Sequence, residues 1–386
     1  MWKKIILSLL IIISGAAGFF VAKAQVTFNN TLNHVNRDYD TALKNVDLSG
    51  IEVNSDDDIV NILVVGNDYR KEKGYDASGL TDTMIIATMD MKHGMLKLTT
   101  LMRDMIVDIP GHDPNKLNSP NSFGGIPLLY KTIAQNFNIE LDGYVEVGFD
   151  AFEKIVNSVG GVEAELTESE ANYLNTTNYI SKKKYRHVKV GKQKLNGNQA
   201  LGYCRIRKGG TYTITGLTDD YGRTWRQRAI ITAVFDRVKT LPATKWIDIA
   251  NKVLDGYVTT DLSNEKILEY ITDVVKMGTT KVNQLQVPIN GYYRASARGE
   301  YSCGSSIVMT DGAKRMAGST AALTRRSRRQ AGSPARSRTS RTFRSAWSLD
   351  GRSGRSLSRG TDSCSWMPTT PRSSCAFSPT CPAMSV

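Results

Sequence analysis

The sequence contains few of the residues from which metal centres and disulfide frameworks are built. It has five cysteines and four histidines in 386 residues, and the cysteines show no metal-ligand spacing. An odd number of cysteines without a regular spacing argues against a disulfide-stapled domain. Cys204 stands beside an arginine, which would suit a nucleophile. We favour a small buried thiol in a strand instead.

The last seventy residues contain no Lys, Glu, Asn, Ile, Tyr or His, and Ser, Arg, Thr, Pro and Gly dominate there. Such a segment cannot bury enough apolar surface to offset the entropy of ordering it. We therefore expect residues 295–386 to form a disordered basic tail. The abrupt change of composition favours a frameshift or read-through product over an evolved tail that touches anionic polymers or lipid head groups.

Outside this tail, positive and negative charges nearly balance. The net charge is +13, but the segment from Ala317 to Val386 holds twelve arginines and two aspartates, which leaves a net charge of only +3 for the rest. The arginines of the globular part must therefore be judged locally. The aromatic residues do not interleave with the arginines as a stacking platform for single strands requires, so we expect no nucleic acid among the partners.

One long hydrophobic run stands at the N-terminus. Lys3 and Lys4 precede about eighteen largely apolar residues, 5–22, which as a helix would rise roughly 27 Å. We expect a single-pass anchor in the cell membrane, with residues 1–4 in the cytoplasm, membrane lipid around the helix and the remaining chain outside. A cleaved signal peptide is the alternative, since Ala22-Lys23-Ala24 fits a cleavage site. Both interpretations export the protein.

A polar linker is expected over residues 23–58, and an alternation of strand and helix patterns follows it. Apolar runs predict strands at 59–66, 84–90, 95–102, 144–149, 202–207 and 282–288. Helical periodicity predicts helices at 127–137, 150–159 with Asp150 as its cap, 226–241, 245–254 and 264–277. This order indicates an α/β fold, a three-layer α/β/α sandwich with a mixed central sheet, preceded by one transmembrane helix.

Five arginines gather between residues 204 and 228: Arg205, Arg207, Arg223, Arg226 and Arg228. In a strand, Arg205 and Arg207 would point to the same face and repel each other unless an anion lay between them. The planar guanidinium group binds phosphate oxygens in pairs. A helix that begins near Arg226 would add its free N–H groups. These residues predict an anion site or, as the alternative, a solvated arginine-rich surface.

Carboxylates accompany these arginines at the ends of expected strands. Asp82 precedes one strand, Arg103 and Asp104 follow another, and Asp68 follows a third. Ligands gather at strand ends in open α/β sheets. Two carboxylates among arginines suit a hard cation that bridges a pyrophosphate, because magnesium takes one or two carboxylates plus substrate oxygens. Taken singly, each aspartate could instead be a turn or cap residue.

Seven motifs in order give the chain a specific resemblance to a known family. They are NILVVGNDYR, LTDTMIIATM, LMRDMIVDIPG, NKLN, DGYVEVGFDAFEKIVNSVGGVE, KLNGNQALGYCRIR and DDYGRTWRQR. Together they resemble the LytR-CpsA-Psr family over about residues 59–241, with a plausible continuation to 294. The resemblance implies a catalytic domain at 59–294. Two departures stand out: Leu80 occupies a position where many members carry Arg, and the pattern is lost after Arg294.

Members of this family are membrane-anchored enzymes of the bacterial envelope. They transfer an anionic glycopolymer, such as teichoic acid or capsule, from a polyprenyl-pyrophosphate carrier to a peptidoglycan acceptor. The resemblance therefore implies a phosphotransferase, with a hydrophobic tunnel between sheet and helices for the polyprenyl chain. Two alternatives remain open, a polyprenyl-pyrophosphate hydrolase and a non-catalytic binder of lipid-linked envelope precursors.

The resemblance also implies roles for single residues. The residues that would hold the pyrophosphate are Arg103, Arg205, Arg207, Arg223 and Gln227, and we add Arg226 at the expected helix start. Asp82 with Asp68 would contact Mg²⁺ or Mn²⁺, directly or through water. Asp104 is a candidate for activating the acceptor hydroxyl, although bracing Arg103 is an equally good role for it. Together with Asp82 and the four arginines 103, 205, 207 and 223, it completes the expected catalytic set.

Overall fold

The computed structural model describes residues 30–310, apart from residues 31, 34, 39–41, 68–80, 243–244, 246–248, 250–257, 280 and 290. The expected anchor at 5–22, the metal ligand Asp68 and the departure at Leu80 therefore lie outside the described residues. So do most of the helix expected at 245–254 and the chain beyond 310. Among the helices that the structure describes, none has the length and apolar character needed to cross a membrane.

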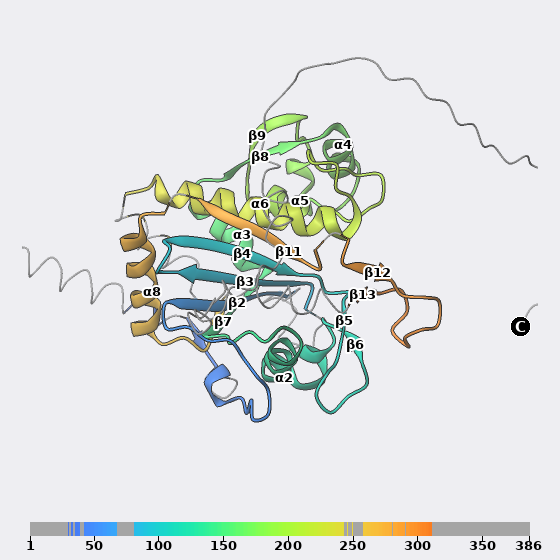
Figure 1. Cartoon of the computed structure of the whole chain (residues 1–386). Coiled ribbons are helices and arrows are strands. Elements are labelled where there is room, and N and C mark those ends of the chain that lie inside the picture. Colours follow the sequence, from blue (N-terminus) through green and yellow to red (C-terminus); the bar gives the residue numbers. More distant parts are fainter. Residues whose placement is uncertain are drawn as a thin grey trace, which may run out of the picture. The chain divides into compact units, whose positions relative to one another are not determined.

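A mixed sheet forms the centre of the described domain (Figure 1). Its strands, in spatial order, are β1 (Asn36–Arg37), β10 (Val258–Thr260), β7 (Gly143–Gly148), β2 (Ile59–Asn67), β3 (Thr83–Asp90), β4 (Met95–Leu101) and β11 (Val282–Val287). β2 pairs parallel with β7 and antiparallel with β3, and β4 pairs antiparallel with β3 and parallel with β11. The prediction of an α/β fold with a mixed sheet is confirmed.

Five of the six expected strands agree with β2, β3, β4, β7 and β11 to within one residue at each end. Most apolar residues of β2, β3 and β4 are buried on both faces of the sheet, which is why the sequence shows continuous runs there. The polarity of these strands matters for the site. β2, β7, β4 and β11 all run in one direction, so their carboxyl ends lie along one edge of the sheet, together with the start of β3.

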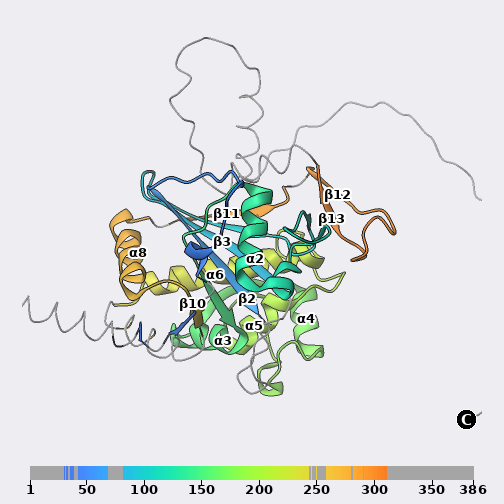
Figure 2. The ribbon, with the colours of Figure 1, turned by 90° about the horizontal axis from the view of Figure 1, so that it is seen from below.

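Helices cover both faces of the sheet, as a three-layer sandwich requires. They are α2 (Pro120–Phe137), α3 (Phe149–Ser158), α4 (Glu168–Thr176), α5 (Gly197–Arg205), α6 (Asp219–Lys239) and α8 (Asn264–Met277), with 3-10 turns η1 (Leu43–Asn45) and η3 (Lys183–Tyr185). In Figure 1, α2 lies below the sheet and α5 and α6 lie above it. Figure 2, seen from below, shows α2 in front of the strands.

The largest cluster of buried apolar side chains lies between the sheet and α2. It joins Leu63, Met84 and Leu101 from three strands to Leu129 and Ile133 of the helix, all at most 2% exposed. Burying a side chain of this size stabilises the fold by about 1.5–3 kcal/mol. α2 contains a break at Gly124 and Gly125, where Gly125 has φ 67°, so the helix expected at 127–137 is the part of α2 that follows this break.

Three further clusters of buried apolar side chains lie outside this one. Val156 of α3, Cys204 of α5 and Ile230 of α6 share one of them with the hairpin β8 (Val162–Leu166) and β9 (Gly191–Leu195). α8 packs near the other ends of the strands, where Ile267 contacts the cluster around Ile62. Cys204 is a buried thiol, and burial raises its pKa, which disfavours the thiolate that a nucleophile needs.

The strand expected at 202–207 is wrong, because residues 202–205 are the end of helix α5, Ile206 is its C-cap and Arg207 follows it. The side chain of Asn196 accepts a hydrogen bond from the Gln199 N–H at 3.0 Å, and the Gln199 side chain accepts one from the Asn196 N–H at 3.0 Å. This reciprocal pair is a capping box, and it starts a helix just ahead of the arginines. Consequently Arg205 and Arg207 do not share the face of a strand.

Two helix starts also differ from expectation. α6 begins at Asp219 and not near Arg226, so the first turn of the helix carries Asp219 and Asp220. α3 begins at Phe149 with Gly148 as its N-cap, and the helix has no side-chain cap, so Asp150 lies in the first turn without capping it. Carboxylates in a first turn still stabilise a helix through its dipole.

The domain is larger than the expected range 59–294. β1 and the buried Leu43 come from the expected linker, and Leu43 is part of the main core. At the other end, β13 (Ile307–Met309) pairs with β12 (Tyr293–Ala295), and the Ile307 N–H donates to the Asp104 carbonyl at 2.8 Å. Residues 42–58 and 295–310 are therefore part of the fold.

Lys97 of β4 is a buried cation, and burial makes its charged form less favourable. It is 5% exposed, and burial lowers its pKa to about 8, although Asp90 opposes the shift. We expect the unsubstituted chain to gain stability relative to Lys97→Met, on the order of 1 kcal/mol, between pH 8 and pH 10.5. In this range the folded chain has released a proton that the unfolded chain still binds, so its free energy of unfolding rises with pH, and the Met variant lacks this contribution.

Chemical denaturation of the Lys97→Met chain between pH 7 and pH 10.5 measures this effect. The exposed Lys92→Met serves as the control, because it removes the same charge from the same hairpin. An equal stability difference at both pH values would contradict the assignment of the penalty to a buried ammonium group.

Candidate active site

The sheet register brings Asp82 and Arg103 together. Thr83 pairs with Gly66 of β2, and Met84 pairs with Leu101 of β4. The residues just beyond these pairs therefore meet at the carboxyl edge of β2 and β4, where an ion pair joins Arg103 Nη1 to Asp82 Oδ1. The side chain of Asp82 is 49% exposed and that of Arg103 is 14% exposed. The structure therefore places two of the expected site residues, Asp82 and Arg103, side by side.

Arg103 is surrounded by three carboxylates. Besides Asp82, its Nε lies 3.4 Å from Asp104 Oδ2 and its Nη2 lies 3.7 Å from Asp220 Oδ1. Burial disfavours the charged form of Arg103, but Asp220, Asp82 and Asp104 outweigh this effect and raise its pKa. Lys116 Nζ approaches Asp104 from the other side, at 3.4 Å from Oδ1. Asp104 is therefore held between two cations.

The first turn of α6 supplies the next pair. Arg223 Nη2 donates to Asp220 Oδ2 at 2.9 Å, one turn apart on the helix. Burial raises the pKa of Asp220, while Arg223 and Arg103 oppose the shift. Burial lowers the pKa of Arg223, Asp220 opposes this effect, and the nearby positive charges of Arg103 and Arg207 add to it. The structure thus brings Arg103, Arg207 and Arg223 within electrostatic reach of one another.

Arg205 and Arg207 stand at the carboxyl end of α5. The guanidinium carbon of Arg205 lies 4.9 Å from the ring centre of Phe149 and 5.6 Å from that of Tyr179. Phe149 directly follows β7, so the rings hold Arg205 at the same edge of the sheet. Neither Arg205 nor the exposed Arg207 makes an ion pair with another described residue.

Gln227 lies one turn after Arg223 on α6 and reaches the sheet. Its Nε2 donates to Thr83 Oγ1 at 2.9 Å, which ties the helix to the start of β3. On the same helix, Thr224 Oγ1 donates to Gln286 Oε1 of β11 at 2.7 Å. These two contacts fix the position of Arg223 relative to Asp82 and Arg103.

The placement of Arg226 in the pyrophosphate site is wrong. Arg226 is fully buried, and its Nε donates to Glu170 Oε1 at 2.7 Å. Its other two nitrogens donate to the carbonyls of Ile206, at 2.9 Å, and Thr211, at 3.1 Å. All three nitrogens are thus used inside the protein. Arg226 connects α6 to α4 and to the segment after α5, and has no surface to offer a ligand.

Several buried polar atoms at this edge have no hydrogen-bond partner among the described residues. They are Arg103 Nε, Arg223 Nε, Gln227 Oε1, Thr81 Oγ1 and Thr218 Oγ1. A buried donor without a partner costs about 1–3 kcal/mol, and native proteins rarely leave several in one place. These unpaired polar atoms lie next to two arginines that have no ion pair with a described residue. An anion-binding site has this arrangement when only its protein groups are counted.

The donor set fits a hard cation that takes most of its ligands from a substrate. Asp82 offers an exposed carboxylate, and Asp220 and Asp104 lie around the same arginine. Within the described ranges, no group of three or more His, Cys, Asp or Glu side chains is placed to hold a metal. Magnesium requires no such group, since it commonly uses one or two carboxylates with phosphate oxygens and water.

Two members of the site were not predicted, Asp220 and Lys116. Both lie within motifs that the sequence analysis singled out, DDYGRTWRQR and NKLN. The spacing Asp220-x-x-Arg223 could have indicated an ion pair on a helix, had the start of α6 been placed at Asp219. Lys116 carries no such signal, because its partner Asp104 is reached through the short pair of β5 (Ile106–Val107) and β6 (Asn115–Lys116).

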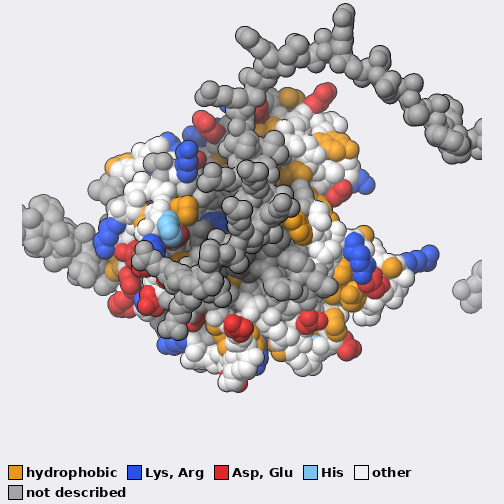
Figure 3. Space-filling view, in the orientation of Figure 1, with side chains coloured by type: hydrophobic (Ala, Val, Ile, Leu, Met, Phe, Trp, Pro, Cys, Tyr) orange, Lys and Arg blue, Asp and Glu red, His pale blue; other side chains and the backbone are white. Residues whose placement is uncertain are grey.

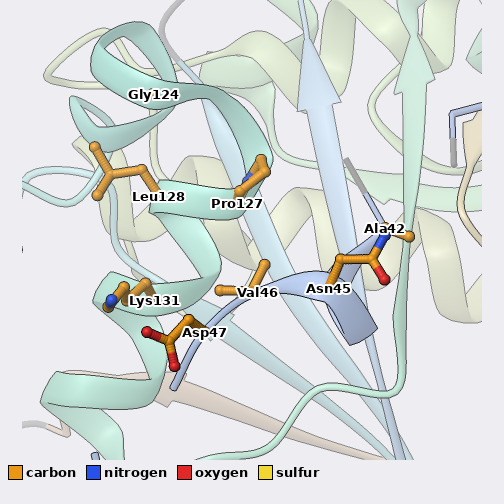
Figure 4. A pocket seen from close by; sticks show the side chains of 8 residues that line it. All are labelled: Ala42, Asn45, Val46, Asp47, Gly124, Pro127, Leu128 and Lys131. Atoms are coloured by element: carbon orange, nitrogen blue, oxygen red, sulfur yellow. The ribbon is translucent and has the colours of Figure 1, made fainter. Parts of the chain in front are cut away.

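A separate pocket of about 330 Å³ lies between η1 and α2 (Figure 4). It is lined by Ala42, Asn45, Val46, Asp47, Gly124, Pro127, Leu128 and Lys131. Figure 4 shows Asp47 and Lys131 near one another at one end of it. None of the charged residues around Arg103 lines this pocket. The tunnel expected for a polyprenyl chain stays a prediction.

Comparison with known proteins identifies similar chains. The sequence model of the LytR_cpsA_psr family matches residues 19–310. A curated relative from Enterococcus faecalis, the polyisoprenyl-teichoic acid–peptidoglycan teichoic acid transferase TagU, is 33% identical over 226 residues, which are 57% of this chain and 66% of that protein. The regulatory protein MsrR of Staphylococcus aureus is 28% identical over 61% of this chain and 66% of its own length. The chain thus spans just under two thirds of these relatives.

A solved structure shares the fold. The LytR-CPS2A-psr family protein YwtF (TagT) from Bacillus subtilis, with bound octaprenyl pyrophosphate lipid, superposes with a TM-score of 0.51 at 22% identity. The match covers 69% of this chain and 91% of that one. The family match also extends beyond the expected boundary at 294, in agreement with the β12–β13 hairpin.

Proposed function

The chain belongs to the LytR-CpsA-Psr family, and we propose that it transfers an anionic glycopolymer from a polyprenyl-pyrophosphate carrier to peptidoglycan. The names of its relatives support this proposal: one is a teichoic acid transferase, and a structural neighbour holds a polyprenyl pyrophosphate. The polymer would be a teichoic acid, a capsule or a similar chain. The transfer would take place at the outer face of the cell membrane, with the domain anchored through residues 5–22.

The observation that carries the proposal is the surplus of cationic donors at the carboxyl edge of the sheet. Arg205 and Arg207 have no ion pair with a described residue, and the buried Nε of Arg223 has no hydrogen bond with one. A pyrophosphate is a compact anion with several oxygens, and guanidinium groups bind such oxygens in pairs. Four arginines from three separate segments can surround it.

In the proposed reaction, a hydroxyl of peptidoglycan attacks the phosphorus that carries the sugar. A new bond forms between this phosphorus and the hydroxyl oxygen, and the bond to the bridging oxygen of the pyrophosphate breaks. Polyprenyl phosphate leaves with the electron pair, and the hydroxyl proton passes to a base or to solvent. The arginines position the two phosphates and stabilise the charge that develops on them, which supplies most of the rate gain in phosphoryl transfer.

Asp104 is the nearest candidate for the base, but its contacts favour the other role. Its two oxygens face Arg103 and Lys116, each at 3.4 Å. Both contacts hold the carboxylate in place, and the one to Arg103 fixes the direction of that guanidinium group. We therefore assign Asp104 as a positioning residue for Arg103.

Asp82 is the residue proposed to hold Mg²⁺ or Mn²⁺, with Asp68, which lies outside the described residues, as its partner. The cation, when bound, would neutralise charge on the phosphate oxygens. Asp82 is exposed and contacts Arg103, so the same carboxylate can orient the arginine and meet a cation that arrives with the donor.

Asp82→Asn is expected to raise the Mg²⁺ concentration for half-maximal turnover at least about tenfold, because it removes one negative charge from the cation's surroundings while its amide oxygen can still accept a hydrogen bond from Arg103. A magnesium titration of turnover measures the shift. Asp236→Asn, an exposed aspartate near the far end of α6, is the matched control. Identical titrations for the two variants would remove Asp82 from the metal site.

Donor binding tests the proposed role of the arginines. We expect the full chain to bind octaprenyl pyrophosphate at least tenfold more tightly than octaprenyl monophosphate, since only the former occupies both halves of the site. The double variant Arg205→Ala/Arg207→Ala should lose most of this preference. Arg237→Ala, at the other end of α6, should keep it. Equal affinity of the unsubstituted chain for both lipids would contradict the assignment of a pyrophosphate site.

A further inference from the structure

The segment between α5 and α6 presents large apolar side chains to solvent beside the site. Six large hydrophobic side chains of the described residues are clearly exposed: Phe123, Val190, Tyr212, Ile214, Ile271 and Tyr292. Tyr212 and Ile214 are 51% and 49% exposed and belong to one loop, residues 207–218. This loop begins at Arg207 and ends at the start of α6, so charged residues of the site flank it on both sides.

The loop is held in place by its backbone. The Tyr212 N–H donates to Ser169 Oγ at 3.1 Å, and its carbonyl accepts from Thr167 Oγ1 at 2.7 Å, so α4 fixes this residue from both sides. Thr211 and Thr213 are 5% and 3% exposed. Buried threonines therefore alternate with exposed Tyr212 and Ile214, and the hydrogen bonds fix which pair points outward.

An ordered loop that exposes two apolar side chains loses their burial energy unless something covers them. A third exposed aromatic, Tyr292, directly precedes β12, whose Tyr293 stacks on Tyr221 of α6 with ring centres 5.7 Å apart. Figure 1 shows the start of α6 and the β12–β13 hairpin at the same end of the domain. In Figure 3, hydrophobic side chains are prominent on that right-hand side, over α4 and over β12–β13.

The charges next to the loop indicate what covers it. Arg207 and Lys208 are exposed at its start and would meet a surface of negative charge. An aromatic ring, an aliphatic chain and two cations on one loop match the interface of an anionic lipid bilayer, where apolar side chains enter the head-group region and cations meet phosphates. A glycopolymer would use the ring, and an anionic one would also pair with Lys208, but it would gain little from Ile214.

We propose that loop 207–218 rests on the membrane surface, with Tyr212 and Ile214 inserted among lipid head groups and Lys208 against anionic phosphates. This inference rests on the proposed function, since it places the arginine site at the depth where the pyrophosphate of a lipid-linked donor lies. With the loop in this position, the carboxyl edge of the sheet faces the bilayer. Arg207 connects the lipid-facing loop with the arginine site, because it is the first residue of the loop and lies within electrostatic reach of Arg223.

Fluorescence quenching in nanodiscs tests the contact directly. The full chain carrying Tyr212→Trp is placed in nanodiscs of phosphatidylglycerol whose acyl chains are brominated, and the signal of the unsubstituted chain is subtracted. We expect quenching of the added indole to be at least threefold stronger than in an Ile271→Trp chain, whose exposed Ile271 lies on α8, near the other ends of the strands. Equal weak quenching in both chains would overturn the proposal.

Turnover supplies a second readout that separates this inference from the proposed function. The chain with Tyr212→Ser and Ile214→Ser should turn over a membrane-embedded long-chain donor about tenfold more slowly and a water-soluble short-chain donor at an unchanged rate. An equal loss on both donors with a raised KM for the acceptor would show glycan docking and overturn the proposal. If the unsubstituted chain turns over neither donor, the proposed function fails, while quenching still decides whether the loop touches lipid.

Discussion

Arg103→Ala is expected to lower the rate of glycopolymer transfer about a thousand-fold without unfolding the domain. Arg103 forms ion pairs with Asp82, Asp104 and Asp220, so it lies at the centre of the site. Its removal takes away one phosphate-binding group and leaves three carboxylates facing the donor. Like charges of this kind repel a pyrophosphate, so both binding and turnover should suffer.

Arg103→Lys separates charge from geometry. Lysine keeps the positive charge but not the planar fork, so we expect it to recover only a small part of the lost rate. Arg237→Ala is the matched control, because Arg237 lies at the other end of α6 and bonds to the Val159 carbonyl. Thermal unfolding of each variant checks that the fold is kept. Full activity in the Arg103→Ala chain would place the reaction elsewhere.

Arg226→Leu is expected to lower the free energy of unfolding by about 3–5 kcal/mol. Arg226 and Glu170 are both fully buried, and the pair is completed by hydrogen bonds to two backbone carbonyls. Removing the arginine leaves the Glu170 carboxylate buried without its cation, while two carbonyls lose their donors. Glu170 also accepts from the Thr167 N–H at 2.9 Å, so the start of α4 would loosen as well.

A double variant shows whether the penalty comes from the unpaired charge. Replacing both partners, Arg226→Met with Glu170→Met, should be less destabilising than Arg226→Leu alone, because no buried charge then remains. Denaturant unfolding of the three chains gives the comparison. If the double variant were the least stable, the loss would belong to packing and not to the ion pair. A single variant with native stability would contradict the buried location of Arg226.

Much of the site could be predicted because it depends on strand ends. The apolar runs that became β2, β3 and β4 are buried on both faces, so their limits are visible in the sequence, and Asp82 and Arg103 stand just outside them. Once the hairpin of β3 and β4 is placed, antiparallel pairing alone brings these two residues together. Arg205 and Arg207 were singled out through a strand that proved to be the end of a helix, and the motifs of the family added Gln227, which periodicity could not assign.

The failures have equally local causes. The segment 202–207 alternates polar and apolar residues as a strand does, but a capping box between Asn196 and Gln199 starts a helix before it. Arg226 looked like the neighbouring arginines in the sequence. Its partner Glu170 lies 56 residues earlier, so only the structure shows that the two side chains are in contact. Short strands such as β1 and β10 carry too few residues for any periodicity to appear.

The product of a single turnover tests the central claim most directly. The full chain is incubated with a polyprenyl-pyrophosphate oligosaccharide, Mg²⁺ and peptidoglycan fragments, and the products are followed by mass. The proposed function predicts a sugar phosphate joined covalently to peptidoglycan, together with released polyprenyl phosphate, and loss of both in the Arg103→Ala chain. Free sugar phosphate without any adduct would contradict transfer and identify a hydrolase. An intact donor that stays bound would identify a carrier-binding protein.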